Sequence, residues 1–237
     1  TNTETRNGRF DGVRTSVTSA LECSMNTSVL LVIDVQNDFL PGGALAVPCG
    51  DEVVPIINAL ARKFENVILT QDWHPPQHIS FASTHSGKSP FETIELPYGP
   101  QVLWPTHCVQ GTHGAALADA LEISHAHAVI RKGHRSDVDS YSAFMEADRT
   151  TRTGLASLLH ERGIKEVYCC GLATDFCVAW SALDARGAGF EAFVIEDACR
   201  AIDQNASLAK ARQRMIDADV RLISLLSLDA TTIEMGQ

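Results

Sequence analysis

From Val29 onward, short apolar runs alternate along the chain with segments of helical periodicity. The apolar runs are VLLVID (29–34), NVILTQ (66–71), AVIRK (128–132), EVYCCG (166–171), AFVIED (192–197) and RLISLL (221–226). Helical spacing of apolar residues appears over 51–64, 153–163, 174–187 and about 205–218. Near-continuously apolar strands that alternate with helices are typical of a parallel sheet covered on both faces. The pattern therefore predicts an α/β fold, a three-layer α/β/α architecture around a six-stranded, mainly parallel sheet.

Two long stretches, residues 72–114 and 133–152, interrupt this alternation and carry Pro, Gly, His and aromatic residues. We expect only short helical segments in them, and loops of this length in a compact domain are usually functional. Residues 1–27 are polar and lack periodicity, which predicts an N-terminal extension outside the core. Residues 28–237 are expected to form one domain.

Composition removes several classes of function. With 19 Lys and Arg against 29 Asp and Glu, the net charge is −10, and we find no basic stripe that would attract a nucleic-acid backbone. No apolar run is long enough to span a membrane or to form a signal-peptide core. The seven cysteines are scattered without a CxxC pair, which excludes a zinc ribbon and a thioredoxin-type pair. We expect a reduced, soluble, cytoplasmic protein.

Chemically active residues follow four of the predicted strands. In open parallel sheets ligands bind beyond the carboxyl ends of the strands. The first two strands lead to Asp34 and Asp72, the third ends at Lys132, and the fourth runs into GLATDFC with Cys177. An acid, a cation and a thiol are therefore predicted at one edge of the sheet.

A cysteine is the remaining candidate nucleophile, because the sequence has no GxGxxG after the first strand, no GxxxxGK[ST] loop and no GxSxG elbow. Cys177 falls in the predicted first turn of a helix, where the helix dipole is expected to lower the thiol pKa. The alternative is a small buried core residue. That alternative suits Cys169, Cys170 and Cys199 better.

A second group of residues has the chemistry of a metal site. Asp72 and His74 are alternate residues just past a strand, so their side chains can project to one side. With His107 from WPTHC (104–108), they offer one carboxylate and two imidazoles, a set that suits Zn, Fe or Mn. Three other histidines lie in the same region as possible alternatives: His78, His85 and His113.

Five runs, taken together and in order, resemble the nicotinamidases, also called pyrazinamidases, of the isochorismatase-like cysteine hydrolases. They are LLVIDVQNDFLPGGALAV (30–47), TQDWHPPQHISFA (70–82), LWPTHCVQGTHGA (103–115), VIRKG (129–133) and CGLATDFCV (170–178). The resemblance covers about residues 29–228. It implies the isochorismatase-like hydrolase fold.

The resemblance also assigns roles to residues of this chain. It implies a catalytic triad of Asp34, Lys132 and Cys177, and metal ligands Asp72, His74 and His107. It implies a cis peptide at Leu172–Ala173, an oxyanion hole formed by the N–H groups of Ala173 and Cys177, and ring-enclosing positions at Phe39, Trp104 and Tyr141. Phe176 and the 133–140 loop fall where the family varies.

The expected function is metal-dependent hydrolysis of nicotinamide to nicotinate and ammonia through a cysteine thioester, in NAD salvage, with pyrazinamide as a further substrate. The expected cofactor is one divalent ion, foremost Zn²⁺, with Fe²⁺ and Mn²⁺ as alternatives; a homo-oligomer is possible, and no nucleic-acid or membrane partner is expected. Three alternatives stay open. They are another amide or vinyl-ether hydrolase of the superfamily, a hydrolase whose nucleophile is a metal-bound hydroxide, and a binding protein without activity, which the intact triad disfavours.

Overall fold

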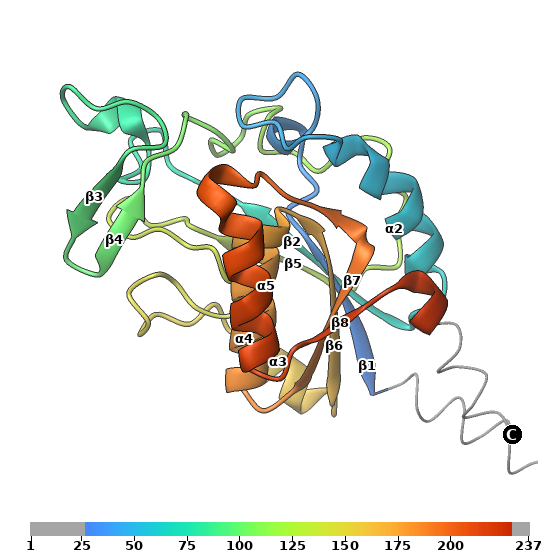
Figure 1. Cartoon of the computed structure of the whole chain (residues 1–237). Helices are drawn as coiled ribbons and strands as arrows, with labels where there is room; N and C mark the ends of the chain where they lie inside the picture. The colour runs from blue at the N-terminus through green and yellow to red at the C-terminus, as the bar shows by residue number, and fades with distance from the viewer. Residues whose placement is uncertain (1–26, 229–237) are drawn as a thin grey trace, which may run out of the picture.

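The computed structural model describes residues 27–228, so the predicted extension lies, except for Thr27, outside the described residues (Figure 1). The sheet consists of β1 (Ser28–Ile33), β2 (Asn66–Asp72), β5 (Ala128–Lys132), β6 (Glu166–Leu172), β7 (Glu191–Arg200) and β8 (Arg221–Ile223). The strand order is β5-β2-β1-β6-β7-β8, and every pair is parallel. The predicted six-stranded parallel sheet is confirmed.

Helices cover both faces of this sheet, as the apolar pattern predicts (Figure 1). Helix α2 (Val53–Ala61) lies on one face, and α4 (Ala179–Gly187) and α5 (Ser207–Asp217) lie on the other. The short helix α3 (Leu155–Glu161) lies near the end of α4, where the ring of His160 stacks on Phe190. Pro55 is tolerated in α2 because it falls in the first turn, where backbone N–H groups lack helical partners.

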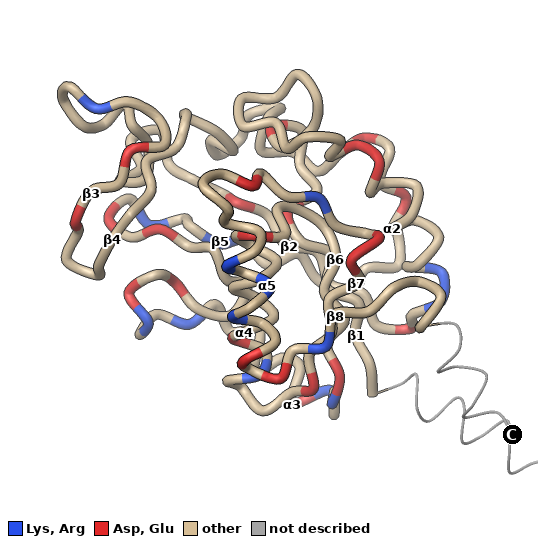
Figure 2. Tube along the Cα trace, viewed as in Figure 1, with Lys and Arg blue, Asp and Glu red and all other residues tan. Residues whose placement is uncertain are grey.

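Central strands are buried along their whole length. All six residues of β1 and all seven of β2 are buried, which explains the uninterrupted apolar runs over residues 29–33 and 67–69. Figure 2 shows Lys and Arg interspersed with Asp and Glu along the trace, without a long basic run. No helix among residues 27–228 is long and apolar enough to cross a membrane.

Sequence reasoning misses one element, a small hairpin inside the 72–114 stretch. It pairs β3 (Thr93–Leu96) with β4 (Gly99–Val102) in antiparallel register. Each strand has four residues, and Pro100 weakens the strand pattern because proline cannot donate to a ladder. The last strand is also shorter than predicted. β8 stops at Ile223, and the side chain of the next residue, Ser224, accepts a hydrogen bond from the N–H of Ser227 at the start of a helical segment whose described residues are 225–228.

The end of β6 approaches β1 very closely at Gly171. Its φ is +115°, and an added Cβ would lie 2.1 Å from the carbonyl oxygen of Ile33. Only glycine fits this position without moving a neighbouring strand. The close approach brings the segment after β6 next to the residue that follows β1.

We predict that Gly171→Ala lowers the free energy of unfolding by about 2 kcal/mol or more, because it combines a positive φ with a backbone clash. The matched control is Gly187→Ala at the end of α4, where nothing lies within 4 Å of the new Cβ. Thermal unfolding should show a clear drop in Tm for the first variant and little change for the second. Equal Tm values for the two variants would contradict the close-approach argument.

Candidate active site

The three residues of the predicted triad meet at the carboxyl edge of the sheet. Asp34 follows β1 directly, Lys132 ends β5, and Cys177 lies in a π-helical turn (Thr174–Val178) between β6 and α4. The Nζ atom of Lys132 lies 2.8 Å from Oδ2 of Asp34 and donates to Sγ of Cys177 at 3.3 Å. The ammonium group therefore joins the acid to the thiol.

Lys132 is fully buried and is surrounded by acceptors. Besides Asp34 and Cys177, its Nζ donates to Oδ1 of Asp72 and, at 3.1 Å, to the carbonyl oxygen of Ser140. Burial alone would lower the lysine pKa, but Asp34 and Asp72 raise it well above its usual range. Lys132 is therefore held as a cation between two carboxylates.

Asp34 has an unusual backbone and a strong hydrogen-bond partner. Its φ of 50° is in the left-handed region, where non-glycine residues are uncommon. Thr70 Oγ1 donates to Oδ1 of Asp34 at 2.5 Å and accepts the backbone N–H of Asp34 at 3.1 Å. Burial raises the pKa of Asp34, although Lys132 opposes that shift. A carboxylate with a raised pKa is a better proton acceptor, as a general base requires.

The expectation that the pKa of the Cys177 thiol is lowered is wrong. Burial raises this pKa well above its usual value, Lys132 lowers it, and Asp34 and Asp72 raise it further. The thiol also lies in the π-helical turn before α4 rather than in the first turn of the helix. The resting residue is therefore a thiol, and its proton must move when the sulfur attacks.

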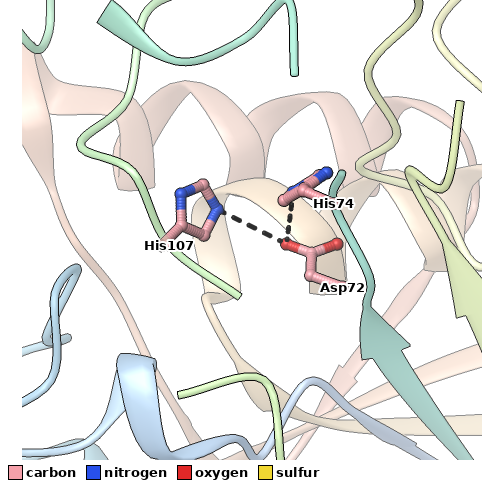
Figure 3. Close-up of side chains that lie close together, drawn as sticks. All are labelled: Asp72, His74 and His107. Carbon is pink, nitrogen blue, oxygen red and sulfur yellow. Dashed lines mark ion pairs between the residues drawn. The ribbon is translucent and has the colours of Figure 1, made fainter. Parts of the chain in front are cut away.

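The three candidate metal ligands also converge (Figure 3), and one of them, Asp72, accepts a hydrogen bond from Lys132 of the triad. Oδ2 of Asp72 lies 3.6 Å from Nε2 of His74 and 3.8 Å from Nε2 of His107. One ligand atom from each residue lies within 4.8 Å of the others, and all three side chains are buried. Asp72 ends β2, and His74 and His107 lie in the loop region that follows.

The hydrogen bonds of His74 and His107 involve their Nδ1 atoms and leave Nε2 of each imidazole free to coordinate a metal ion. Nδ1 of His74 lies 2.9 Å from the carbonyl oxygen of Gly133, and Nδ1 of His107 lies 2.7 Å from that of Pro105. A carbonyl oxygen only accepts, so each Nδ1 carries the proton and each Nε2 presents its lone pair toward Asp72. This donor set fits a divalent ion.

The alternative histidines do not provide a better set. His78 lies near His74 and Asp139, but its Nε2 donates to the carbonyl oxygen of Val138 at 3.0 Å, and its Nδ1 accepts the N–H of Ser80 at 3.3 Å. Burial lowers the pKa of His78 to about 4, so it is neutral. His85 lies 2.7 Å from the carbonyl oxygen of Ile79, and His113 is exposed.

Aromatic side chains form the walls of the pocket that contains Cys177. The three predicted ring-enclosing residues, Phe39, Trp104 and Tyr141, all line it, and Nε1 of Trp104 donates to the Tyr141 hydroxyl at 3.0 Å. Phe176 also lines it, with its ring centroid 4.9 Å from that of Trp104.

Phe176 and Asp139, which falls in the 133–140 loop, line the pocket at the positions where the family varies, whereas sequence reasoning assigns no role to the lining residues Leu45 and Ile202. The Leu172–Ala173 peptide bond is cis, as the resemblance implies.

Known proteins match this fold over most of its length. The isochorismatase domain model matches residues 28–220. A nicotinamidase of Acinetobacter baylyi is 59% identical over 199 residues, which cover 84% of this chain and 93% of that protein. A solved nicotinamidase and pyrazinamidase of Acinetobacter baumanii has a TM-score of 0.85 and 60% identity, covering 86% of this chain and 98% of that one. A pyrazinamidase of Pyrococcus horikoshii, solved in complex with zinc, has a TM-score of 0.69 and 35% identity, covering 84% and 99%.

The three-layer fold and the family match define the class of this protein: the chain belongs to the isochorismatase family. Within that family, its high-identity relatives group it with the nicotinamidases. The protein is therefore an amidohydrolase.

We predict that Lys132→Met slows the alkylation of Cys177 by iodoacetamide at pH 7 by about tenfold or more. Lys132 lowers the thiol pKa, so its removal raises that pKa, and each unit of increase removes about nine-tenths of the reactive thiolate. Peptide-level mass spectrometry measures the rate, and the exposed Cys49 is the internal control in both proteins. Circular dichroism checks that the variant is folded. Equal Cys177 rates in a folded variant would rule out this role for Lys132.

Proposed function

We propose that this protein hydrolyses nicotinamide to nicotinate and ammonia through a thioester on Cys177. The observation that carries the proposal is the buried Lys132 ammonium group, which lies 2.8 Å from Asp34 and 3.3 Å from the thiol in an aromatic-walled pocket. The nicotinamidase names of the relatives support the substrate. Pyrazinamide, which carries the same carboxamide on a diazine ring, is proposed as a second substrate.

Asp34 begins the reaction by taking the proton of the Cys177 thiol, and the Lys132 ammonium group stabilises the thiolate that forms. The sulfur then attacks the carboxamide carbon, and the negative charge that develops on the carbonyl oxygen is held by the N–H groups of Ala173 and Cys177. Asp34 returns the proton to the departing nitrogen, and ammonia leaves. Asp34 next takes a proton from water, and the water oxygen attacks the thioester carbon. The C–S bond then breaks, nicotinate leaves, and Asp34 returns the proton to the Cys177 sulfur.

Recognition of the ring is assigned to two sets of side chains. Phe39, Trp104 and Tyr141 enclose its faces and edges. Asp72, His74 and His107 would hold one divalent ion, foremost Zn²⁺, with Fe²⁺ or Mn²⁺ as alternatives. When bound, such an ion supplies a Lewis acid that orients the pyridine nitrogen.

The proposed reaction belongs to NAD salvage, because it converts the amide released from pyridine nucleotides into the free acid. We assign it to a single domain over residues 28–237. A metal-bound hydroxide as nucleophile is the competing mechanism, and it requires no thiol. The two mechanisms differ in what a cysteine substitution does.

Replacing Cys177 with Ala should abolish nicotinamide hydrolysis and leave the fold intact, because the substitution removes the nucleophile and changes little volume. Ammonia release gives the activity, and the melting curve gives the state of the fold. Cys199→Ala is the matched control, since Cys199 is also buried but lies in β7 and does not line the pocket. Activity of Cys177→Ala within tenfold of wild type would favour the hydroxide mechanism.

The metal-ligand set should discriminate nicotinamide from benzamide, which has C–H in place of the pyridine nitrogen. A site built to bind a polar group can reject an analogue lacking it by up to ~10⁵, and we expect about 10²–10³ here because water can remain on the ion. His107→Ala should reduce kcat/KM for nicotinamide far more than for benzamide, and chelation followed by metal addition should do so reversibly. Equal losses for both amides would mean that the ligand set does not act in ring recognition.

A further inference from the structure

Asp175 lies in the π-helical turn of the nucleophile, two residues before Cys177, and it is almost fully buried. Its carboxylate accepts three hydrogen bonds. The donors are the backbone N–H of Ile202 at 3.1 Å, the backbone N–H of Asp203 at 2.8 Å and the hydroxyl of Ser207. All three belong to one segment, the connection from β7 to the first residue of α5.

This connection holds an unfavourable backbone conformation next to the pocket. Asp203, Asn205 and Ala206 have φ values of 51°, 54° and 59°, which cost non-glycine residues free energy. Such conformations persist only where surrounding contacts determine them. The side chain of Ile202, at the start of the connection, lines the pocket that contains the thiol. The Asp175 carboxylate therefore ties a wall of the pocket to the turn that carries the nucleophile.

We propose that Asp175 is a positioning residue that fixes Ile202 against the nucleophile turn and so sets the width of the ring site. The proposal rests on the proposed function, since it takes nicotinamide as the substrate whose ring contacts Ile202. Asp175 acts by fixing the position of Ile202 and not by changing the ionisation of the Cys177 thiol.

A double-mutant cycle in the full-length, metal-loaded enzyme tests this coupling. Asp175→Asn should raise KM for nicotinamide about tenfold, because one acceptor oxygen is replaced by an N–H₂ group that faces an N–H donor. Ile202→Ala should raise KM by a similar factor, with kcat of both variants within about threefold of wild type. The double variant should match the more severe single variant rather than reach the product of about one hundredfold. A multiplicative effect would overturn the proposal.

Two controls separate positioning from loss of stability. Asp148→Asn removes a carboxylate with the same donor pattern, since Asp148 accepts the N–H groups of Thr150 and Thr151 and the Thr151 hydroxyl, but it does not line the pocket. It should leave KM unchanged. Ser207→Ala removes one of the three donors to Asp175 and should give a smaller rise in KM, which keeps the test open if Asp175→Asn folds poorly.

Two further readouts do not depend on turnover. Amide hydrogen exchange at Ile202 and Asp203 should accelerate about tenfold in Asp175→Asn, while the pH midpoint of Cys177 alkylation should stay that of wild type. Unchanged exchange, or a shifted midpoint, would overturn the proposal. If wild-type enzyme releases no ammonia from nicotinamide, the proposed function fails, and the exchange measurement still decides whether Asp175 holds the wall.

Discussion

The site depends on one buried cation, the ammonium group of Lys132. It lies among Asp34, Asp72 and the Cys177 thiol with no exposure to solvent. Two buried carboxylates so close together would repel each other, and removal of one partner from a buried pair typically costs about 3–5 kcal/mol. Lys132 therefore allows two buried carboxylates to lie close together: Asp34, which accepts a proton, and Asp72, which faces the imidazoles.

Asp72 connects the two halves of the site because its two oxygens have different partners. Oδ1 accepts from Lys132, and Oδ2 faces His74 and His107 (Figure 3). Burial alone would raise the pKa of Asp72, but Lys132 lowers it well below the usual range, so the residue stays ionised. A change in charge at His74 or His107 therefore affects Lys132 through the Asp72 carboxylate.

Much of this arrangement is predictable from the sequence because it follows from strand ends. Asp34, Asp72 and Lys132 end or follow apolar runs, and parallel topology brings such ends to one edge of the sheet. The ionisation of Cys177 is not predictable in this way, since it depends on burial and on two carboxylates from other strands. Ile202 is distant in sequence from every motif, and only the folded connection after β7 brings it to the pocket.

The position of Asp72 itself depends on a residue that is neither a triad member nor a ligand. Gln36, fully buried two residues after Asp34, accepts the backbone N–H of Asp72 at 2.8 Å and donates to its carbonyl oxygen at 2.9 Å. The same Nε2 donates to the carbonyl oxygen of Ala115 at 2.8 Å, in the loop that follows His107. One amide thus holds the segment after β1, the last residue of β2 and the histidine-bearing loop together. Because Asp72 contacts both Lys132 and the imidazoles, this backbone anchor aligns the triad and the ligand set at once.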